Sequence, residues 1–354
     1  MSQEIELKLT ANQEVINSLK QELSHFQLLT QKQVFSQNSY FDTEDHFFAK
    51  KKMGLRVRKE QDRYTMTLKT AGLTQGALHI RPEYNVQLSS STPDMTQFAQ
   101  YAELQLERDY QTLQSTLQPI FSTDFQREYY LLETGNGTQL EIAIDQGKIL
   151  AKQQQAPISE IEIELKNGKV IDVLNFVQNL LFLDGMRLGQ ESKAERGYQL
   201  AGLGKAAQKV TLNDWQQLLQ QHYVSAQEQI LALYQYELRL LKFLEQTDRS
   251  KLILDAEATT TMLDLFSKLY QYYVEKTALL QQAASTLEQQ QLAVAEIIDD
   301  VYEGNQVVYQ QLRQIIARHL EHQDHTKAIQ QLFDLTAQGQ YLQRMINLLK
   351  FTLK

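Results

Sequence analysis

Charged and aliphatic residues alternate in the segment EIELKL, residues 4–9. Successive side chains of a β-strand point to opposite faces, so Glu4, Glu6 and Lys8 would share one face of such a strand. Like charges two residues apart lie about 7 Å from each other, which costs little in water but much in an enclosed space without a counterion. A sheet face exposed to water would explain this one segment taken alone.

Several other segments separate charge onto one strand face in the same way. Clustered carboxylates predict a divalent cation if their face is enclosed, and clustered cations predict a polyanion. Both sets facing each other would bind a metal–polyphosphate, whereas a plain sheet with one wet face remains the alternative. The acidic residues are Glu141, Asp145, Glu160, Glu162 and Glu164, and the basic ones are Arg56, Arg58, Lys69, Arg81 and Arg127, with Glu83 beside Arg81.

The elements that would position these residues form an α+β fold. Eight strands with few helices predict a closed antiparallel β-barrel, a tunnel filled with charge. Its outward aliphatic residues must be covered, and amphipathic helices at 13–24 and 170–183 can cover them. The strands are expected near residues 3–9, 33–41, 53–60, 63–70, 80–88, 124–134, 138–146 and 158–166.

The chain changes character near residues 202–212. All four prolines lie at or before Pro157, and only Gly304 and Gly339 follow Gly204 among the glycines. Long stretches without helix breakers predict an all-α helical bundle as the second domain. We therefore expect a tunnel domain over residues 1–204 and a bundle over 205–354. Its helices are expected at 213–246, 257–288, 290–320 and 326–350.

Composition excludes several classes of function. The 354 residues carry a formal net charge of -8, which disfavours general binding of nucleic acid or anionic membranes. The absence of cysteine excludes disulfides, thiolate metal sites and cysteine nucleophiles. The first residues resemble no secretory signal, and the longest apolar cluster, at 173–183, is too short to span a membrane. We expect a cytoplasmic protein without nucleic-acid or membrane partners.

Taken together and in order, the charged segments resemble the CYTH family, also called triphosphate tunnel metalloenzymes. A single ExExK motif is weak evidence, but the ordered set of motifs is specific and covers about the first 200 residues. The motifs are EIELK at 4–8, YFDT at 40–43, LRVR at 55–58, TLK at 67–69, RPEYNV at 81–86, TDFQRE at 123–128, LEIAIDQG at 140–147, ISEIEIELKNG at 158–168 and SKAERGYQL at 192–200.

This resemblance implies a tunnel that binds triphosphate substrates together with Mg²⁺ or Mn²⁺. It implies catalytic roles for Glu4, Lys8 and Glu162, with Glu83 and Glu141 as further tunnel residues. The implied metal ligands are Glu4, Glu6, Asp145, Glu162 and Glu164. The implied substrate-binding residues are Lys8, Arg56, Arg58, Lys69, Arg81, Arg127, Lys193 and Arg196.

The activity that the resemblance favours is hydrolysis of inorganic triphosphate to pyrophosphate and phosphate. Class IV adenylate cyclases and thiamine or nucleoside triphosphatases are alternatives, and a non-catalytic polyphosphate-binding sensor is a rival of another class. The helical region resembles a degenerate CHAD module, in which Tyr236 stands where histidine is expected and only Arg239 and Lys242 supply charge. We expect this region to be structural or to form a homodimer. His319, His322 and His325 are interpreted as a polar helix end rather than a metal site.

Overall fold

The computed structural model describes residues 2–75, 77–180, 184–204, 209–246, 256–289 and 292–353. The chain forms two compact units, one of Met1–Val173 with Gly189–Ala206 and one of Leu174–Leu188 with Ala207–Lys354. Leu174–Leu188, which sequence patterns placed in the first domain, thus group with the helical unit. The assignment of 1–204 and 205–354 as separate functional domains stays a prediction.

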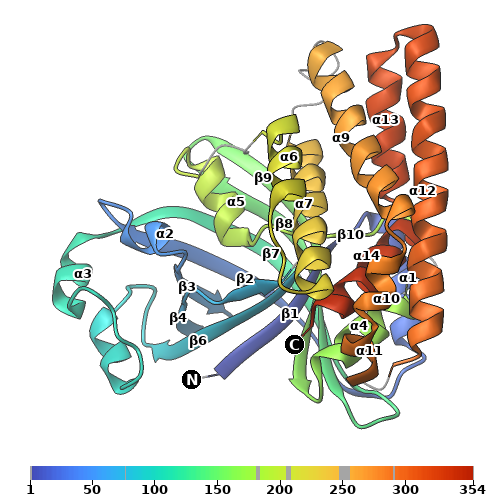
Figure 1. The fold of residues 1–354 in the computed structure, drawn as a ribbon. Coiled ribbons are helices and arrows are strands. Elements are labelled where there is room, and N and C mark those ends of the chain that lie inside the picture. Colours follow the sequence, from blue (N-terminus) through green and yellow to red (C-terminus); the bar gives the residue numbers. More distant parts are fainter. Residues whose placement is uncertain are drawn as a thin grey trace. The chain divides into compact units, whose positions relative to one another are not determined.

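A closed barrel of eight antiparallel strands forms the first unit, as predicted (Figure 1). The strands are hydrogen-bonded in the order β1, β9, β8, β7, β2, β3, β4 and β6, and the pairing of β6 with β1 closes the ring. All eight expected strands are present, and β2 and β7 begin before their predicted starts. The strands are β1 Ser2–Thr10, β2 Leu28–Thr43, β3 Gly54–Glu60, β4 Arg63–Lys69, β6 Leu78–Leu88, β7 Leu117–Glu133, β8 Gln139–Ala151 and β9 Gln154–Asn167, and two short ones are β5 Leu73–Gln75 and β10 Arg187–Leu188.

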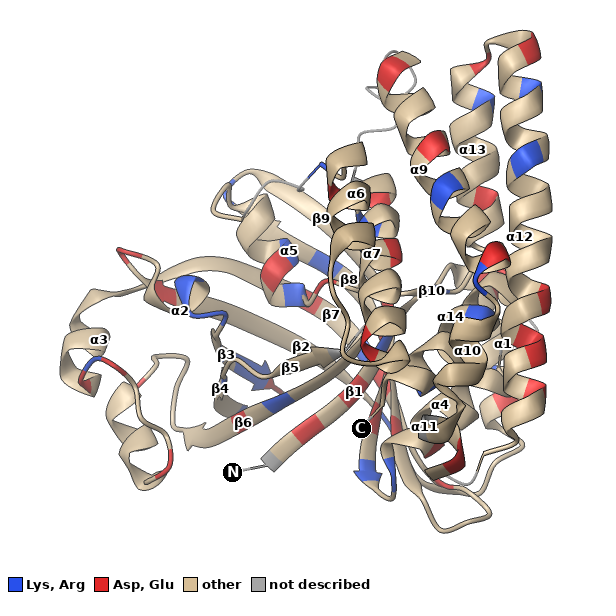
Figure 2. Ribbon diagram, in the orientation of Figure 1, with Lys and Arg blue, Asp and Glu red and all other residues tan. Residues whose placement is uncertain are grey.

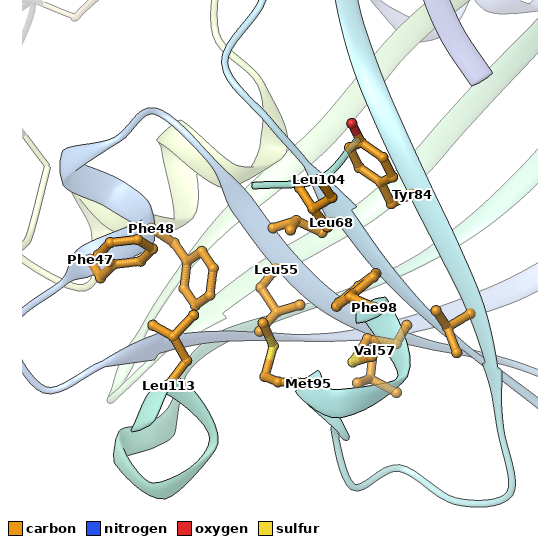
Figure 3. Packing of buried hydrophobic residues seen from close by; sticks show 12 residues of the cluster. Phe47, Phe48, Leu55, Val57, Leu68, Tyr84, Met95, Phe98, Leu104 and Leu113 are labelled. Atoms are coloured by element: carbon orange, nitrogen blue, oxygen red, sulfur yellow. The ribbon is translucent and has the colours of Figure 1, made fainter. Parts of the chain in front are cut away.

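Short helices and apolar side chains cover the outer face of the barrel. Leu55, Val57 and Leu68 point outward from β3 and β4 and pack against Phe98 and Leu113 (Figure 3). In α1 the four residues predicted to share one side, Val15, Ile16, Leu19 and Leu23, are all buried. The helices of this unit are α1 Gln13–Leu23, α2 Phe47–Lys50, the 3₁₀ helix η1 Met95–Gln100, α3 Tyr110–Thr116 and α5 Lys193–Leu200. Helix α4 Val170–Gln178 begins in the first unit and continues into the second after Val173.

The second unit is helical, but its helices are shorter than expected. The prediction of one continuous helix over 213–246 is wrong, because the chain turns before Ala226. There the Ser225 hydroxyl accepts a hydrogen bond from the backbone N–H of Glu228. The Glu228 carboxylate in turn accepts one from the backbone N–H of Val224, and the two bonds cap the start of a new helix. No helix in the described part of the chain combines the length and the apolar character that crossing a membrane requires.

Two other predicted helices are also divided. The stretch 257–288 is broken after Glu275, and 326–350 is broken before Gly339. Residues 181–183, the end of the helix predicted at 170–183, lie outside the described residues. The helices of this unit are α6 Leu212–Gln220, α7 Ala226–Gln246, α9 Ala256–Glu275, α10 Ala278–Gln282, α11 Ala284–Gln289, α12 Val294–His322, α13 His325–Thr336 and α14 Gly339–Thr352.

Candidate functional site

Strand register aligns the charged residues on the inner face of the barrel. Directly opposed residues of neighbouring antiparallel strands share a face of the sheet. Lys8 lies opposite Glu162 in the β1–β9 ladder, and Asp145 lies opposite Glu160 in the β8–β9 ladder. Figure 2 shows acidic and basic residues at intervals along these strands. The alternation seen in the sequence therefore becomes one enclosed surface that carries both signs of charge.

Two lysines lie among three carboxylates at one part of this surface. Oxygen atoms of Asp145, Glu160 and Glu162 lie within 4.8 Å of one another. The Lys8 ammonium is 2.7 Å from Glu162 and 3.1 Å from Glu160, and its side chain is only 2% exposed. Lys193 lies 2.6 Å from Asp145 and 3.0 Å from Glu162, and it also contacts Glu160. We call the group of Lys8, Lys193, Asp145, Glu160, Glu162 and Arg127 the lysine cluster.

Arg127 completes the lysine cluster with a fork of hydrogen bonds. Its guanidinium donates to both oxygens of Asp145, at 2.7 and 2.6 Å, and to Glu162 at 2.7 Å. Burial alone would raise the pKa of Glu162, but Lys193, Lys8 and Arg127 outweigh burial and hold that pKa well below its usual range. The carboxylates of this cluster are therefore already neutralised by cations of the chain.

A second group of carboxylates is less well compensated. Lys69 donates to both oxygens of Glu4 at 2.6 Å and lies 3.2 Å from Glu83, so one ammonium serves two carboxylates. Burial raises the pKa of Glu4 to about 7, and Lys69 only partly opposes this. Glu83, with a further hydrogen bond from Asn85, has its pKa lowered to about 2 in spite of burial, through Lys69 and Arg56.

Glu6 and Glu164 lie beside Glu4 on the same face and are direct partners in the β1–β9 ladder. Arg81 donates to Glu6 at 3.0 Å. Glu164 has Lys166 at 2.7 Å, yet burial raises its pKa above the usual value. We call Glu4 and Glu6 of β1, together with Glu164 of β9 that faces them, the β1 carboxylates. The five predicted metal ligands therefore fall into two groups. Glu4, Glu6 and Glu164 form one group, and Asp145 and Glu162 belong to the lysine cluster.

The β1 carboxylates are chemically suited to a hard divalent cation. Mg²⁺ and Mn²⁺ prefer oxygen ligands, and buried carboxylates with raised pKa values gain most from a nearby positive charge. Burial raises the pKa of Glu4 and Glu164, whereas Lys69, Lys8 and Arg81 outweigh burial and lower that of Glu6. The lysine cluster also brings three carboxylates together, but Lys8, Lys193 and Arg127 already occupy the positions of a counterion. The carboxylate oxygens of this face therefore suit a metal ion, and Glu4 and Glu164 are the carboxylates still short of positive charge.

Arg56 and Arg58 supply positive charge from β3. Arg58 donates to the Asn38 side chain at 3.0 Å, while burial together with the charges of Arg56 and Arg127 lowers its pKa to about 10. The Nε atom of Arg56 is buried and has no hydrogen-bond partner among the described residues. These arginines repel one another and are only partly paired, as expected for side chains that await an anion.

Helix α5 delivers the last two predicted residues, Lys193 and Arg196. Ser192 caps this helix and exchanges hydrogen bonds with Glu195 in a capping box, which fixes the first turn and with it Lys193. Arg196 lies 3.6 Å from Glu160. The remaining predicted tunnel residue, Glu141, lies opposite Glu164 in the β8–β9 ladder.

Two residues of the inner face, Lys166 and His79, were not predicted, and Glu160, although part of the predicted acidic row, was given no metal-binding or substrate-binding role. Glu160 and Lys166 extend the row of Glu162 and Glu164 by one step at each end, so the two-residue period already signalled both. His79 lies opposite Glu6 and is 4% exposed, and burial and Arg81 lower its pKa to about 4, so its ring is neutral. Only its position two residues before Arg81 could have indicated it.

Comparison with known proteins gives consistent results. Residues 2–198 match the CYTH domain family. The chain is 37% identical over 357 residues to an inorganic triphosphatase of Haemophilus influenzae, covering 99% of this chain and 98% of that protein. Among solved structures, a putative adenylyl cyclase from Hippeastrum, described as having a dominant triphosphatase activity, aligns with 55% of this chain and 95% of its own at 18% identity and a TM-score of 0.41. A Pyrococcus horikoshii protein aligns with 53% and 94% at 17% identity and a TM-score of 0.36.

Proposed function

The chain belongs to the CYTH family, and on that premise we propose that it is an inorganic triphosphatase that hydrolyses tripolyphosphate to pyrophosphate and phosphate in its barrel. The similarity to the Haemophilus influenzae enzyme extends over 99% of the chain. The observation that carries the proposal is the inner face itself, where carboxylates and cations from seven of the eight strands share one enclosed surface. A plain anion-binding protein would need the cations but not the carboxylates.

The cations of the chain would bind and orient the substrate. Arg56, Arg58 and Arg127 would donate to phosphate oxygens, and Lys8 and Lys193, fixed by the lysine cluster, would stabilise charge that develops during transfer. Their hydrogen bonds to Glu162 hold these groups in place before substrate arrives. Such preorganised groups stabilise charge without having to rearrange during the reaction.

The β1 carboxylates would hold Mg²⁺ or Mn²⁺. When bound, this cation would neutralise phosphate oxygens and assist phosphoryl transfer. The contacts favour a different role for one of the residues that the resemblance makes catalytic. Glu4 remains a proposed catalytic and metal-binding residue, whereas Glu162, bonded to Lys8, Lys193 and Arg127, is better suited to positioning those cations than to accepting a proton.

The substitution Glu4→Gln tests the proposal because it removes one carboxylate charge and keeps the side-chain shape. We expect kcat/KM for tripolyphosphate with Mg²⁺ or Mn²⁺ to fall about 10²–10³-fold, as for loss of one preorganised electrostatic group. Phosphate release by the purified chain is the measurement. Glu133→Gln is the control, since Glu133 lies exposed at the end of β7. Wild-type rates in Glu4→Gln would disprove the role of Glu4.

The same assay distinguishes the alternatives when ATP and thiamine triphosphate are compared with tripolyphosphate. Preference for ATP with a cyclic product would indicate an adenylate cyclase. Preference for thiamine triphosphate would indicate an organic triphosphatase. Tight binding of tripolyphosphate without phosphate release in either metal would indicate a sensor.

A further inference from the structure

A cavity of about 460 Å³ lies at the turn between β3 and β4. It is lined by Arg58, Glu60, Arg63, Thr65 and Gln87. Only Arg58 was among the predicted site residues. We call this cavity the hairpin cavity.

The hairpin cavity continues the inner face of the barrel. Arg58 lies opposite Thr65 and Glu60 opposite Arg63 in the β3–β4 ladder, and Thr65 lies opposite Gln87 in the β4–β6 ladder. All five lining residues therefore share one face with the substrate-binding arginines. Glu60 lies four residues beyond Arg56, which is roughly 13 Å along the strand. The cavity thus extends the charged row beyond the groups that would hold three phosphates.

The lining of the cavity favours an anion. Glu60 is engaged by the Ser36 hydroxyl and lies 3.5 Å from Arg58. The exposed Arg63 forms no ion pair with another described residue, so its guanidinium is available to a ligand. The Gln87 amide donates to the Thr65 hydroxyl at 3.1 Å, which leaves that hydroxyl proton free to donate in turn.

The lining also argues against an organic group. None of the five lining residues is aromatic or aliphatic, so the cavity offers no surface on which a nucleobase or a thiamine ring could stack. Guanidinium, hydroxyl and amide donors are the groups that bind phosphate oxygens.

We propose that the hairpin cavity binds an additional phosphate of a linear polyphosphate whose first three phosphates lie deeper in the barrel. The inference rests on the proposed function. It makes the enzyme selective for inorganic chains longer than three phosphates over triphosphates that carry an organic group, with Arg63 as the residue that sets this preference.

The test compares tripolyphosphate, tetrapolyphosphate and ATP in a phosphate-release assay with Mg²⁺. Arg63→Glu should lower the ratio of kcat/KM for tetrapolyphosphate to that for tripolyphosphate about tenfold, the usual effect of losing one charge-assisted hydrogen bond. The control is Lys59→Glu, which makes the same change of charge on the same hairpin. Lys59 is exposed and lies on the opposite strand face, beside Tyr64. It should leave the ratio unchanged.

Each outcome decides one question. A ratio for Arg63→Glu within twofold of wild type, or an equal fall in Lys59→Glu, would overturn the role of the cavity. Loss of ATP turnover equal to the loss for tetrapolyphosphate would overturn the choice of phosphate over an organic group. Failure of the wild-type chain to hydrolyse tripolyphosphate would instead refute the proposed function, and the two failures are therefore distinguishable.

Discussion

The barrel and the helical unit both bury charge, but they do so in opposite ways. The barrel places many carboxylates and cations around an inner face, and several of them share partners. Among its described residues, the helical unit buries the ion pair of Glu237 with Arg344, whose side chains are 0% and 1% exposed. It also buries Lys350, whose ammonium donates to the Gln178 side chain and whose pKa burial lowers to about 8. Since burying charge is costly, each region must compensate for it, and the manner of compensation separates their roles.

Around the Glu237–Arg344 pair the compensation is complete. Arg344 donates two hydrogen bonds of 2.9 Å to the two oxygens of Glu237. Three tyrosine hydroxyls donate to the same carboxylate: Tyr270 at 2.5 Å, Tyr341 at 2.6 Å and Tyr273 at 3.2 Å. Their rings also surround the guanidinium, with the centroids of Tyr270 and Tyr273 at 4.7 and 4.8 Å from its central carbon. Both oxygens of Glu237 therefore already have partners within the chain.

In the barrel the compensation is incomplete. Burial leaves the pKa of Glu4 at about 7, and burial together with repulsion from Arg56 and Arg127 leaves that of Arg58 at about 10. Carboxylates short of positive charge and arginines short of negative charge coexist on one face. A metal–polyphosphate would supply both. Several incompletely compensated charges of both signs on one face therefore mark the candidate binding site, whereas the Glu237–Arg344 pair requires no ligand.

Removing one partner of the balanced pair should have the largest effect. Arg344→Met leaves the Glu237 carboxylate buried without its cation, and we expect the free energy of unfolding to fall by about 3–5 kcal/mol. The chain has a single tryptophan, Trp215, in α6, so its fluorescence during urea unfolding reports on the helical unit. Tripolyphosphate turnover per folded molecule should not change.

Arg313→Met is the matched control. Arg313 is exposed on α12, so its replacement should lower the free energy of unfolding only slightly. The double variant Glu237→Leu with Arg344→Met should recover part of the lost stability, since no unpaired charge then remains. Equal stabilities of Arg344→Met and Arg313→Met would contradict the interpretation of the pair as structural.

The unbalanced charges of the barrel predict a pH-dependent metal affinity. The pKa of Glu4 in the folded chain, about 7, lies above its usual value of 4.5, so most molecules carry a proton on this group at pH 6. A metal ligand must be deprotonated, so affinity should rise as pH rises through 7. We expect the Kd for Mn²⁺, measured by calorimetry, to fall about tenfold between pH 6 and pH 8.

The dependence on pH should become weaker in Glu4→Gln, which binds Mn²⁺ weakly at both pH values, and the raised pKa of Glu164 accounts for what remains. Glu83→Gln should retain it, because the pKa of Glu83 is about 2 and that group stays ionised throughout. Equal pH slopes in wild type and Glu4→Gln would show that the β1 carboxylates do not hold the metal through Glu4.

The strands and their faces follow from the sequence because a two-residue period determines both. Because Glu4, Glu6 and Lys8 alternate with aliphatic residues, they must share one face of the strand. Leu7 is buried on the opposite face, and the charged side chains therefore point into the barrel. The same rule placed Glu162 on the inner face.

Partners within the site could not be derived in this way. The pairing of Lys8 with Glu162 depends on the register between two strands that are far apart in the sequence, and the division of carboxylates into two groups follows from it. Lys193 reaches Asp145 only because α5 lies beside the barrel strands. Helix boundaries such as the start of α7 after Ser225 were missed, because the helical spacing of apolar residues continues across the boundary. Only one capping side chain marks it.

Arg239 in α7 should give the smallest effect and tests whether the helical unit binds polyphosphate. This arginine is 44% exposed, lies 3.7 Å from Asp214 and covers the ring of Tyr236 at 5.3 Å. It is therefore already engaged within its own unit, and its surface ion pair contributes under about 1 kcal/mol to stability. We expect Arg239→Ala to change kcat/KM for tripolyphosphate and the Kd for long-chain polyphosphate, measured by calorimetry, less than twofold. A tenfold loss of long-chain binding would show that the helical unit also recognises anions, and the contrast between the two units would no longer hold.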